Sequence, residues 1–298
     1  MTAFAVLVDW GTSSFRLWLV DGAGDVLAER RSGEGMATAG EAMGGFAGVL
    51  ERQLDALGAD ADLPVIACGM VGARQGWVEA PYRAVPCAPA GGNGMIRALV
   101  HDDRLDVRII PGLSQASPAD VMRGEETQIA GFVAANPDFD GILCLPGTHT
   151  KWAHISAKEI VSFRTFMSGE IFALIAGQSV LRHSVTTDGF DDDAFLEAVS
   201  ESLSRPESFA ARAFSLRAGS LLDGLAAETA RARLSGWLIG MELAAARAYW
   251  LGQPVVLIGA PALSGLYAKA LQAQGLTPVT ADGDAMTLAG LAAAHLGV

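Results

Sequence analysis

One pattern of apolar runs and turns occurs twice in the chain, and this repetition restricts the fold more than any other feature. Each copy has three strand-like runs, at 4–8, 15–20 and 26–30 in the first and at 142–145, 152–155 and 159–163 in the second. Gly11 and Thr12 stand in the first turn of one copy, and Gly147 and Thr148 stand in the same place in the other. The offset is about 136 residues, roughly one domain length, so we expect two domains of similar topology.

The segments between and after the two copies predict helices and further buried strands. Helices are expected at 40–57, 171–181, 192–203, 210–225, 233–251, 262–274 and 285–296, and strands at 65–67, 107–110, 255–258 and 277–280. Strands followed by helices favour an α/β architecture over a sandwich. Turn residues between Pro111 and Pro118 suggest the boundary, so the predicted domains are 1–115 and 116–298.

Charge and cysteine content exclude several classes of function. The chain has 33 acidic and 21 basic residues, a net charge of −12, and no basic patch, which disfavours nucleic acids and anionic membranes as partners. Asp9 interrupts the first apolar run too early for a signal peptide or a membrane span. Three cysteines without CxxC spacing predict neither a disulfide framework nor a zinc site. We therefore expect a cytoplasmic protein.

The two Gly-Thr turns are candidate phosphate sites. Glycine lets the backbone approach an anion closely, and hydroxyl groups add donors without requiring positive charge. The expected phosphate-binding residues are Gly11, Thr12, Ser13, Gly147, Thr148, Thr150 and Lys151. Asp9, just before the first turn, suits a hard cation such as Mg²⁺. Any tight turn uses the same residue types, so each turn alone indicates little, and the duplication carries the argument.

Common catalytic motifs do not occur in the sequence. It contains no GxxxxGK[ST] loop, no complete GxGxxG, no GxSxG and no HExxH, and its five histidines are scattered. P-loop, Rossmann, serine-hydrolase and zinc-protease interpretations therefore lose their usual support.

The segment DWGTSS at 9–14 resembles the first phosphate motif of the actin, sugar-kinase and Hsp70 superfamily. Within that superfamily the chain resembles the 2-dehydro-3-deoxygalactonokinases, most specifically in VMRGEETQ at 121–128 and PGTHTKW at 146–152, and also in LSGWLIGME at 234–242. The resemblance implies two RNase-H-like (actin-like ATPase) domains flanking a nucleotide cleft. It also implies Mg²⁺-dependent transfer of the ATP γ-phosphoryl group to a keto-deoxy sugar acid, with the acid on the N-terminal side and ATP on the C-terminal side.

For catalysis, the resemblance implies an acidic base shortly before the second phosphate turn. Glu125 and Glu126 are the candidates, and the sequence leaves open which one faces the substrate, because neighbours on a helix point about 100° apart. Related carbohydrate kinases usually have Asp at this position. From residue physics alone, an acidic pair at a solvated helix N-terminus is the commoner case.

For substrate binding, a sugar acid requires a cation, and Arg123 and Arg164 are the candidates. Either arginine could instead pair with a neighbouring acid. Trp77 and Tyr82 are expected in the wall of the sugar site, although aromatic residues in turns more often pack. Gly259 and Ala260 follow the apolar run 255–258 as in the superfamily's adenosine motif, with an ordinary strand-to-helix connection as the alternative.

The resemblance implies phosphorylation of 2-dehydro-3-deoxy-D-galactonate to the 6-phosphate in galactonate catabolism. Two alternatives stay open: a phosphohydrolase of the same superfamily acting on polyphosphate or a nucleotide, and a non-catalytic nucleotide-gated binding protein. Partners other than ATP and the sugar acid are not expected, apart from a second copy in a homodimer. The preference between galactonate- and gluconate-derived substrates is left open.

Overall fold

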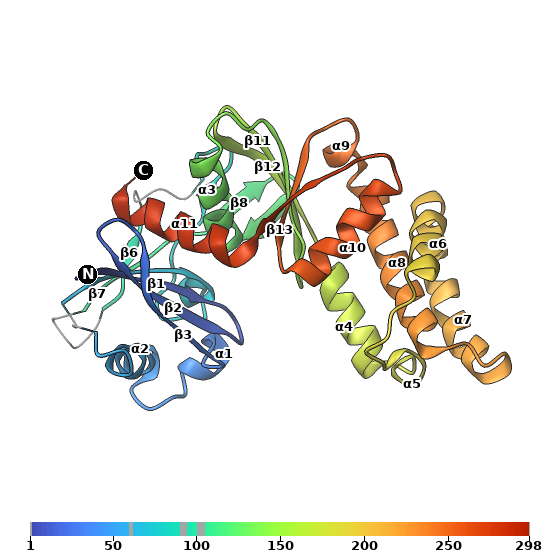
Figure 1. Ribbon diagram of the computed structural model, residues 1–298, viewed down its shortest axis with the longest axis horizontal. Coiled ribbons are helices and arrows are strands. Elements are labelled where there is room, and N and C mark those ends of the chain that lie inside the picture. The colour runs from blue at the N-terminus through green and yellow to red at the C-terminus, as the bar shows by residue number, and fades with distance from the viewer. Residues whose placement is uncertain (1, 60–61, 90–93, 100–104, 298) are drawn as a thin grey trace. The chain divides into compact units, whose positions relative to one another are not determined.

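The computed structural model describes residues 2–59, 62–89, 94–99 and 105–297, which form two compact units (Figure 1). Unit 1 consists of Met1–Asp140, Ile155–Ser162 and Gly283–Val298, and unit 2 of Gly141–His154 and Phe163–Asp282. This division differs from the expected boundary at residue 115. The composition of turns cannot predict this division, because the last helix of the chain, far from the first residues in sequence, belongs to unit 1.

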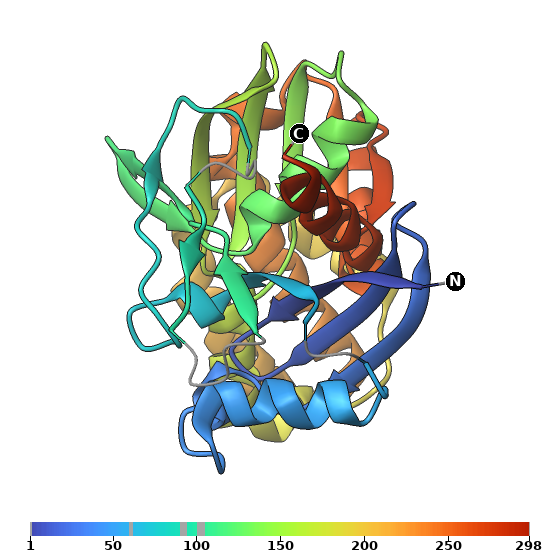
Figure 2. The same ribbon diagram turned by 90° about the vertical axis from the view of Figure 1, so that its left-hand side faces the viewer.

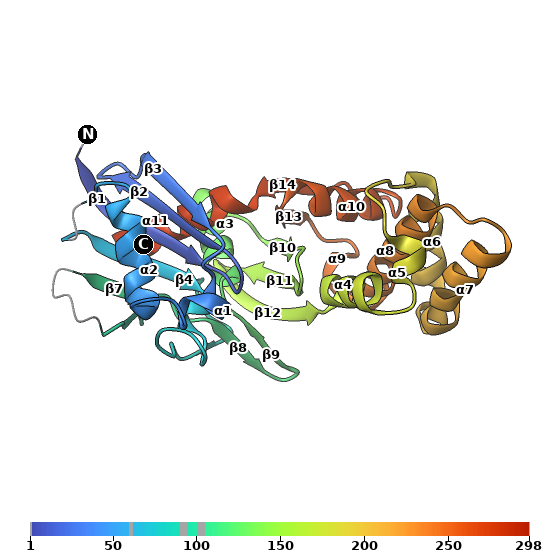
Figure 3. The same cartoon turned by 90° about the horizontal axis from the view of Figure 1, so that it is seen from below.

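Unit 1 contains a six-stranded sheet of order β3-β2-β1-β4-β7-β6. The strands are β1 (Ala3–Trp10), β2 (Phe15–Asp21), β3 (Val26–Ser32), β4 (Pro64–Gly69), β6 (Ile96–Arg97) and β7 (Asp106–Ile109). β1 pairs antiparallel with β2 and parallel with β4, which in turn pairs parallel with β7 (Figure 3). A small sheet of order β5-β8-β9 adds β5 (Arg83–Ala84), β8 (Leu113–Ala116) and β9 (Ala119–Met122).

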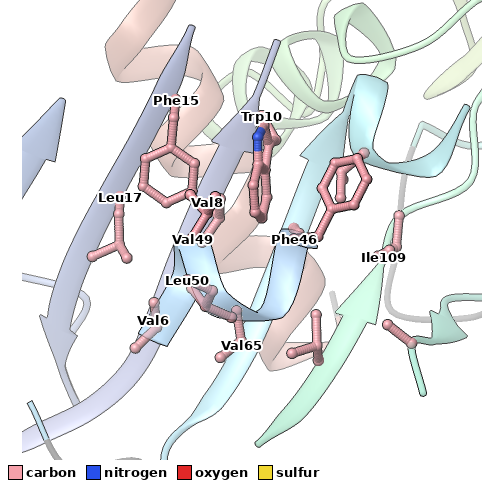
Figure 4. Close-up of a cluster of buried hydrophobic side chains, with 14 of the residues drawn as sticks. Val6, Val8, Trp10, Phe15, Leu17, Phe46, Val49, Leu50, Val65 and Ile109 are labelled. Carbon is pink, nitrogen blue, oxygen red and sulfur yellow. The ribbon is translucent and has the colours of Figure 1, made fainter. Parts of the chain in front are cut away.

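Helices cover both faces of the large sheet in unit 1 (Figure 2). They are α1 (Met36–Ala39), α2 (Gly45–Asp55), α3 (Glu125–Ala135) and α11 (Gly283–Leu296), with the 3₁₀ turn η1 (Met70–Gly72) after β4. Trp10, Phe15 and Leu17 from the sheet pack against Phe46 and Leu50 of α2, forming the main core (Figure 4). The helix expected at 40–57 begins only at Gly45, because Gly44 and Gly45 both have positive φ angles.

A five-stranded sheet of order β12-β11-β10-β13-β14 repeats the order of the first five strands in the six-stranded sheet. Most of it belongs to unit 2, and the end of β11 with the first half of β12 belongs to unit 1. The strands are β10 (Gly141–Leu145), β11 (Thr150–Ser156), β12 (Glu159–Phe166), β13 (Val255–Gly259) and β14 (Val279–Asp282). The shared strand order confirms the expected α/β fold with duplicated RNase-H-like topology. β11 already begins at Thr150, two residues before the expected run 152–155.

A group of helices surrounds α8 in unit 2 (Figures 1 and 3). The helices are α4 (Ser168–Gln178), α5 (Arg182–Val185), α6 (Asp192–Ser204), η2 (Pro206–Ser208), α7 (Phe209–Leu222), α8 (Ala227–Ala245), α9 (Arg247–Trp250) and α10 (Pro261–Gln272). Gly236 and Gly240 let α8 approach α6 closely, because a Cβ at either position would lie within 2.5 Å of an α6 carbonyl oxygen. Among the described residues, no helix is long and apolar enough to cross a membrane.

Candidate active site

In unit 1, the turn after β1 is held in place by its backbone. The Gly11 N–H donates to the Ser14 carbonyl at 2.8 Å, and the Gly11 and Thr12 carbonyls accept from the N–H groups of Met36 and Ala37, each at 2.9 Å. The side chains of Thr12 and Ser13 are exposed. The carbonyl oxygens thus point to α1, while two hydroxyl groups remain accessible to a phosphate.

Asp9, near the end of β1, lies in a network of charged side chains. One Oδ of Asp9 accepts from Arg16, whose second guanidinium nitrogen pairs with Asp284 at the start of α11. Arg31 also pairs with Asp284, at 2.9 Å. Burial raises the pKa of Asp9, and the ion pair with Arg16 opposes that shift. Sequence reasoning missed both Arg16 and Asp284, because their pairing joins positions far apart in the chain.

The donor set at Asp9 fits one kind of metal site only. The described residues contain no group of three or more His, Cys, Asp or Glu side chains that could hold a metal ion. One carboxylate is sufficient for Mg²⁺ that keeps its waters and arrives on nucleotide phosphates. The site therefore fits a cation delivered with a nucleotide, and Asp9 would be its protein contact.

The two adjacent acids at the start of α3 have different surroundings. Glu126 is 0% exposed, and its carboxylate accepts from the Gly124 N–H at 2.7 Å and from the Thr127 hydroxyl at 3.2 Å. Burial, with a further contribution from Glu125, raises the pKa of Glu126 to about 8. Glu125 is only partly buried and lies close enough to Asp9 to raise its pKa. Of the two candidates, only Glu125 reaches the surface beside Asp9.

Arg123 is held next to this acidic pair. Its guanidinium lies 4.4 Å from the centre of the Tyr82 ring, and Nη2 donates to the Ala80 carbonyl at 2.8 Å. Nε and Nη1 are buried and have no hydrogen-bond partner within the described part of the chain. A Cβ at Gly72 would lie 2.9 Å from Nη1, so glycine leaves room for the guanidinium. Arg123 thus has two donors without a partner, on different edges of the guanidinium, and each suits a separate acceptor atom.

The structure gives the surroundings of the two other candidates for the substrate site, Trp77 and Arg164. Trp77 packs in the core of unit 1, stacked on Phe46 with ring centres 6.0 Å apart and edge-on to Trp10. Arg164 lies exposed on β12 in unit 2, and no ion pair to it is found among the residues that the structure describes. The structure therefore groups Arg123 and Tyr82 within unit 1, while Trp77 packs in the core of that unit and Arg164 is exposed on unit 2.

In unit 2, a pocket of about 420 Å³ opens beside the second Gly-Thr turn. Gly147 and Thr148 form one wall, and Ser168 and Gly169 at the start of α4 form the next. A Cβ at Gly169 would lie 2.3 Å from the Gly147 carbonyl, so only glycine allows the helix to approach this turn. A helix N-terminus beside an exposed Gly-Thr turn is suited to bind phosphate.

The rest of this pocket is mainly apolar and comes from α4, α8, α10 and the segment before α6. Its lining residues are Phe172, Phe190, Arg231, Ser235, Leu238, Ile239, Ala262, Leu263, Leu266 and Tyr267. Gly259 and Ala260 lead directly into α10, and a Cβ at Gly259 would lie 3.2 Å from the Pro146 carbonyl. Glycine at that position therefore brings the start of α10 close to the phosphate turn.

Two of the expected phosphate ligands in unit 2 are engaged within the protein. Thr150 is buried, and its hydroxyl lies 3.0 Å from the Tyr267 hydroxyl. Lys151 is 5% exposed, and its Nζ donates to the His149 carbonyl at 3.0 Å. Thr148 is exposed. The turn therefore presents Gly147 and Thr148 to the pocket, while the buried Thr150 anchors the turn through its contact with Tyr267.

Comparison with known proteins gives these sites their context. A family model described as 2-keto-3-deoxy-galactonokinase matches residues 9–294. The chain is 47% identical to a "Probable 2-dehydro-3-deoxygalactonokinase" of Rhizobium meliloti (strain 1021), covering 96% of this chain and 95% of that protein. It is 34% identical to the 2-dehydro-3-deoxygalactonokinase of Escherichia coli (strain K12), covering 98% and 97%.

Solved structures agree with the sequence comparisons. A crystal structure of a Sinorhizobium meliloti protein with the same family name aligns with a TM-score of 0.90 and 45% identity, covering 98% of each chain. An activator of 2-hydroxyisocaproyl-CoA dehydratase from Clostridium difficile shares the fold alone, with a TM-score of 0.53 and 12% identity. Fold and comparisons together define a sugar kinase, a phosphotransferase with the actin-like ATPase fold that uses ATP. The chain belongs to the 2-keto-3-deoxy-galactonokinase family.

Proposed function

We propose that the chain transfers the γ-phosphoryl group of ATP to the 6-hydroxyl of 2-dehydro-3-deoxy-D-galactonate, a step of galactonate catabolism. The observation that carries this proposal is the Arg123 guanidinium, stacked on Tyr82 with two unused buried nitrogens. A carboxylate would accept charge-assisted hydrogen bonds from these donors, which are about twice as strong as the hydrogen bonds that the hydroxyl groups of a neutral hexose could accept from them. The name of the curated relatives from Rhizobium meliloti and Escherichia coli supports this substrate.

In the proposed reaction, Glu125 is the general base. It accepts the proton of the 6-hydroxyl as that oxygen forms a bond to the γ-phosphorus, and the bond from the γ-phosphorus to the bridging oxygen of ADP breaks. The hydroxyl groups of Thr12 and Ser13 in unit 1 and of Thr148 in unit 2 donate to the phosphates, and Gly147 lets the backbone approach them closely. Bound Mg²⁺ would neutralise phosphate charge, with Asp9 as its protein contact.

The pocket in unit 2 is the proposed site of the adenosine moiety. Its apolar lining from α8 and α10 suits a base and ribose, and the Gly-Thr turn at one side suits the phosphates that follow. Gly259 and Ala260 contribute by placing α10 beside that turn. Lys151 and Thr150 support the turn from within the fold.

Arginine variants test the substrate assignment. Arg123→Lys keeps the charge but loses the planar pair of donors, so we expect the KM for the sugar acid to rise about tenfold or more while the KM for ATP stays unchanged. Arg164→Lys is the matched variant on β12, and the assignment predicts little change for it. A raised KM in Arg164→Lys alone would move the carboxylate site to that residue.

The homodimer, the cytoplasmic location and the choice between galactonate- and gluconate-derived acids stay predictions. The first is tested by molar mass in solution and the last by comparing kcat/KM for the two acids.

A further inference from the structure

Glu242 is a buried carboxyl that the proposed reaction does not use. It lies on α8 and is 2% exposed. Three donors from three other elements converge on it: the Trp152 Nε1–H of β11 at 2.8 Å, the Tyr267 hydroxyl of α10 at 2.9 Å and the Ser168 hydroxyl at the start of α4. No ion pair to Glu242 is found within residues 2–59, 62–89, 94–99 and 105–297, so hydrogen bonds alone hold this carboxyl.

The partners of Glu242 belong to the pocket of unit 2. Tyr267 and Ser168 both line it, and Gly169, next to Ser168, is in contact with the Gly147 carbonyl. The Tyr267 hydroxyl also lies 3.0 Å from Thr150 Oγ1, and that oxygen lies 3.4 Å from the Gly147 N–H. A chain of hydrogen bonds therefore runs from the phosphate turn through Thr150 and Tyr267 to Glu242.

The donors in this chain have a fixed direction when the carboxyl is ionised. Trp152 can only donate, so Oε1 must accept. Tyr267 and Ser168 donate to Oε2, which leaves the Tyr267 oxygen free to accept from the Thr150 hydroxyl. Thr150 Oγ1 can then accept from the Gly147 N–H. Every polar hydrogen in the chain has one acceptor, and the orientation of the turn depends on the carboxyl at its end.

A role limited to filling space does not account for these contacts. Burial of a carboxyl is costly, and an apolar side chain of similar size would fill the volume without that cost. The groups that Glu242 orders are the two sides of the pocket: the phosphate turn with α4 on one side and α10 on the other.

We propose that Glu242 is a positioning residue of the nucleotide pocket, whose hydrogen bonds to Ser168, Tyr267 and, through Tyr267, Thr150 hold the phosphate turn in the geometry that binds ATP. This inference rests on the proposed function of that pocket. It adds that Glu242 helps to set the affinity for the nucleotide without contacting any nucleotide atom.

Glu242→Gln removes the fixed donor-to-acceptor direction of these hydrogen bonds and keeps the size of the side chain. Whichever way the amide faces, its NH₂ group meets a donor: either Trp152 N–H, or the two hydroxyl groups, which must then reverse. If Tyr267 reverses, it donates to Thr150, and the Thr150 hydroxyl loses the acceptor for its own proton. We expect this variant to bind ADP about tenfold or more weakly, since a broken buried hydrogen bond has effects of that order.

The experiment is calorimetric titration of ADP into the full-length protein, together with KM values for ATP and the sugar acid and the melting temperature. Tyr267→Phe removes the hydroxyl group that links Thr150 to Glu242, so it should weaken ADP binding to a similar degree. The double variant Glu242→Gln/Tyr267→Phe should bind ADP no more weakly than either single variant. In both, KM for ATP should rise while KM for the sugar acid stays within about twofold. Tyr267→Phe and Ser168→Ala carry the test if Glu242→Gln fails to fold.

Two controls separate the possible failures. Glu201→Gln alters another carboxyl that accepts from a tryptophan, the Trp237 Nε1–H at 2.8 Å, away from the pocket, and it should leave ADP binding unchanged. Ala262→Trp places a large side chain at an exposed position of the pocket wall and should block ADP. Suppose that Ala262→Trp loses ADP binding while Glu242→Gln and Tyr267→Phe keep normal ADP affinity. This result would overturn the role of Glu242 and leave the pocket assignment intact. Normal ADP binding in Ala262→Trp would overturn the pocket assignment and this inference with it.

Discussion

At the scale of single residues, burial separates side chains that the sequence presents as equivalent. Glu125 and Glu126 are adjacent and identical in type, and only their packing shows that one is closed in the core and the other lies beside Asp9. Residue type suggested Asp9 for a cation, and the family resemblance, which implies an acidic substrate, suggested Arg123 and Arg164 for its carboxylate; these roles stay predictions. Arg16 and Glu242 were missed, since their roles depend on partners brought together by the fold.

The first prediction concerns the base. Glu125→Gln should lower kcat by about 100-fold or more, because a general base contributes roughly that much, while Glu126→Gln should retain most of the activity. Steady-state kinetics of both purified variants, with melting temperatures to confirm folding, makes the comparison. Loss of activity in Glu126→Gln with a normal rate in Glu125→Gln would reverse the assignment.

Glu126 should also make stability depend on pH. Its pKa is raised from 4.5 to about 8 on folding, so the folded state binds more protons than the unfolded state between these values. The contribution of Glu126 to the free energy of unfolding should therefore be largest below about pH 4.5 and be lost as the pH rises from there through 8, by an amount on the order of a few kcal/mol. Denaturant titrations should show a shallower fall for Glu126→Gln. Parallel curves for the variant and the parent protein would contradict this.

At the scale of helices and strands, most elements follow the hydrophobic pattern, and the exceptions have local causes. The first copy of the three-strand pattern lies at β1, β2 and β3 and the second at β10, β11 and β12, close to the predicted ranges. β11 starts earlier than expected because Thr150 and Lys151 face the interior, although Thr and Lys are common in turns. Such burial depends on Tyr267 and other distant residues, which a local pattern does not contain.

Close contact between α3 and α11 gives a prediction at this scale. A Cβ at Gly290 would lie 1.9 Å from the Thr127 carbonyl oxygen, so Gly290→Ala should lower the free energy of unfolding by about 1–3 kcal/mol, as overpacked cores do. Gly265→Ala on α10 is the control: a Cβ there meets no atom within 4 Å, and alanine should stabilise the helix by about 0.5–1 kcal/mol. Equal effects in the two variants, measured by urea denaturation, would contradict the packing argument.

At the scale of the whole molecule, the duplication was predictable and the division of the chain was not. Two copies of one strand order follow from the repeated Gly-Thr turns and apolar runs. The assignment of α11 to unit 1 depends on Gly131 and Gly290, whose lack of side chains allows close packing with no distinctive sequence signal. The convergence of both phosphate turns on a single triphosphate stays a prediction.

The central claim is that this kinase selects its substrate by a carboxylate. Its most direct test is ADP formation by the parent protein with 2-dehydro-3-deoxy-D-galactonate and with neutral hexoses, each at saturating ATP. We expect kcat/KM for the acid to exceed that for the hexoses by about 100-fold or more, since a site built for a charged group rejects substrates that leave its donors unpaired. Comparable or faster phosphorylation of a neutral hexose would contradict the account.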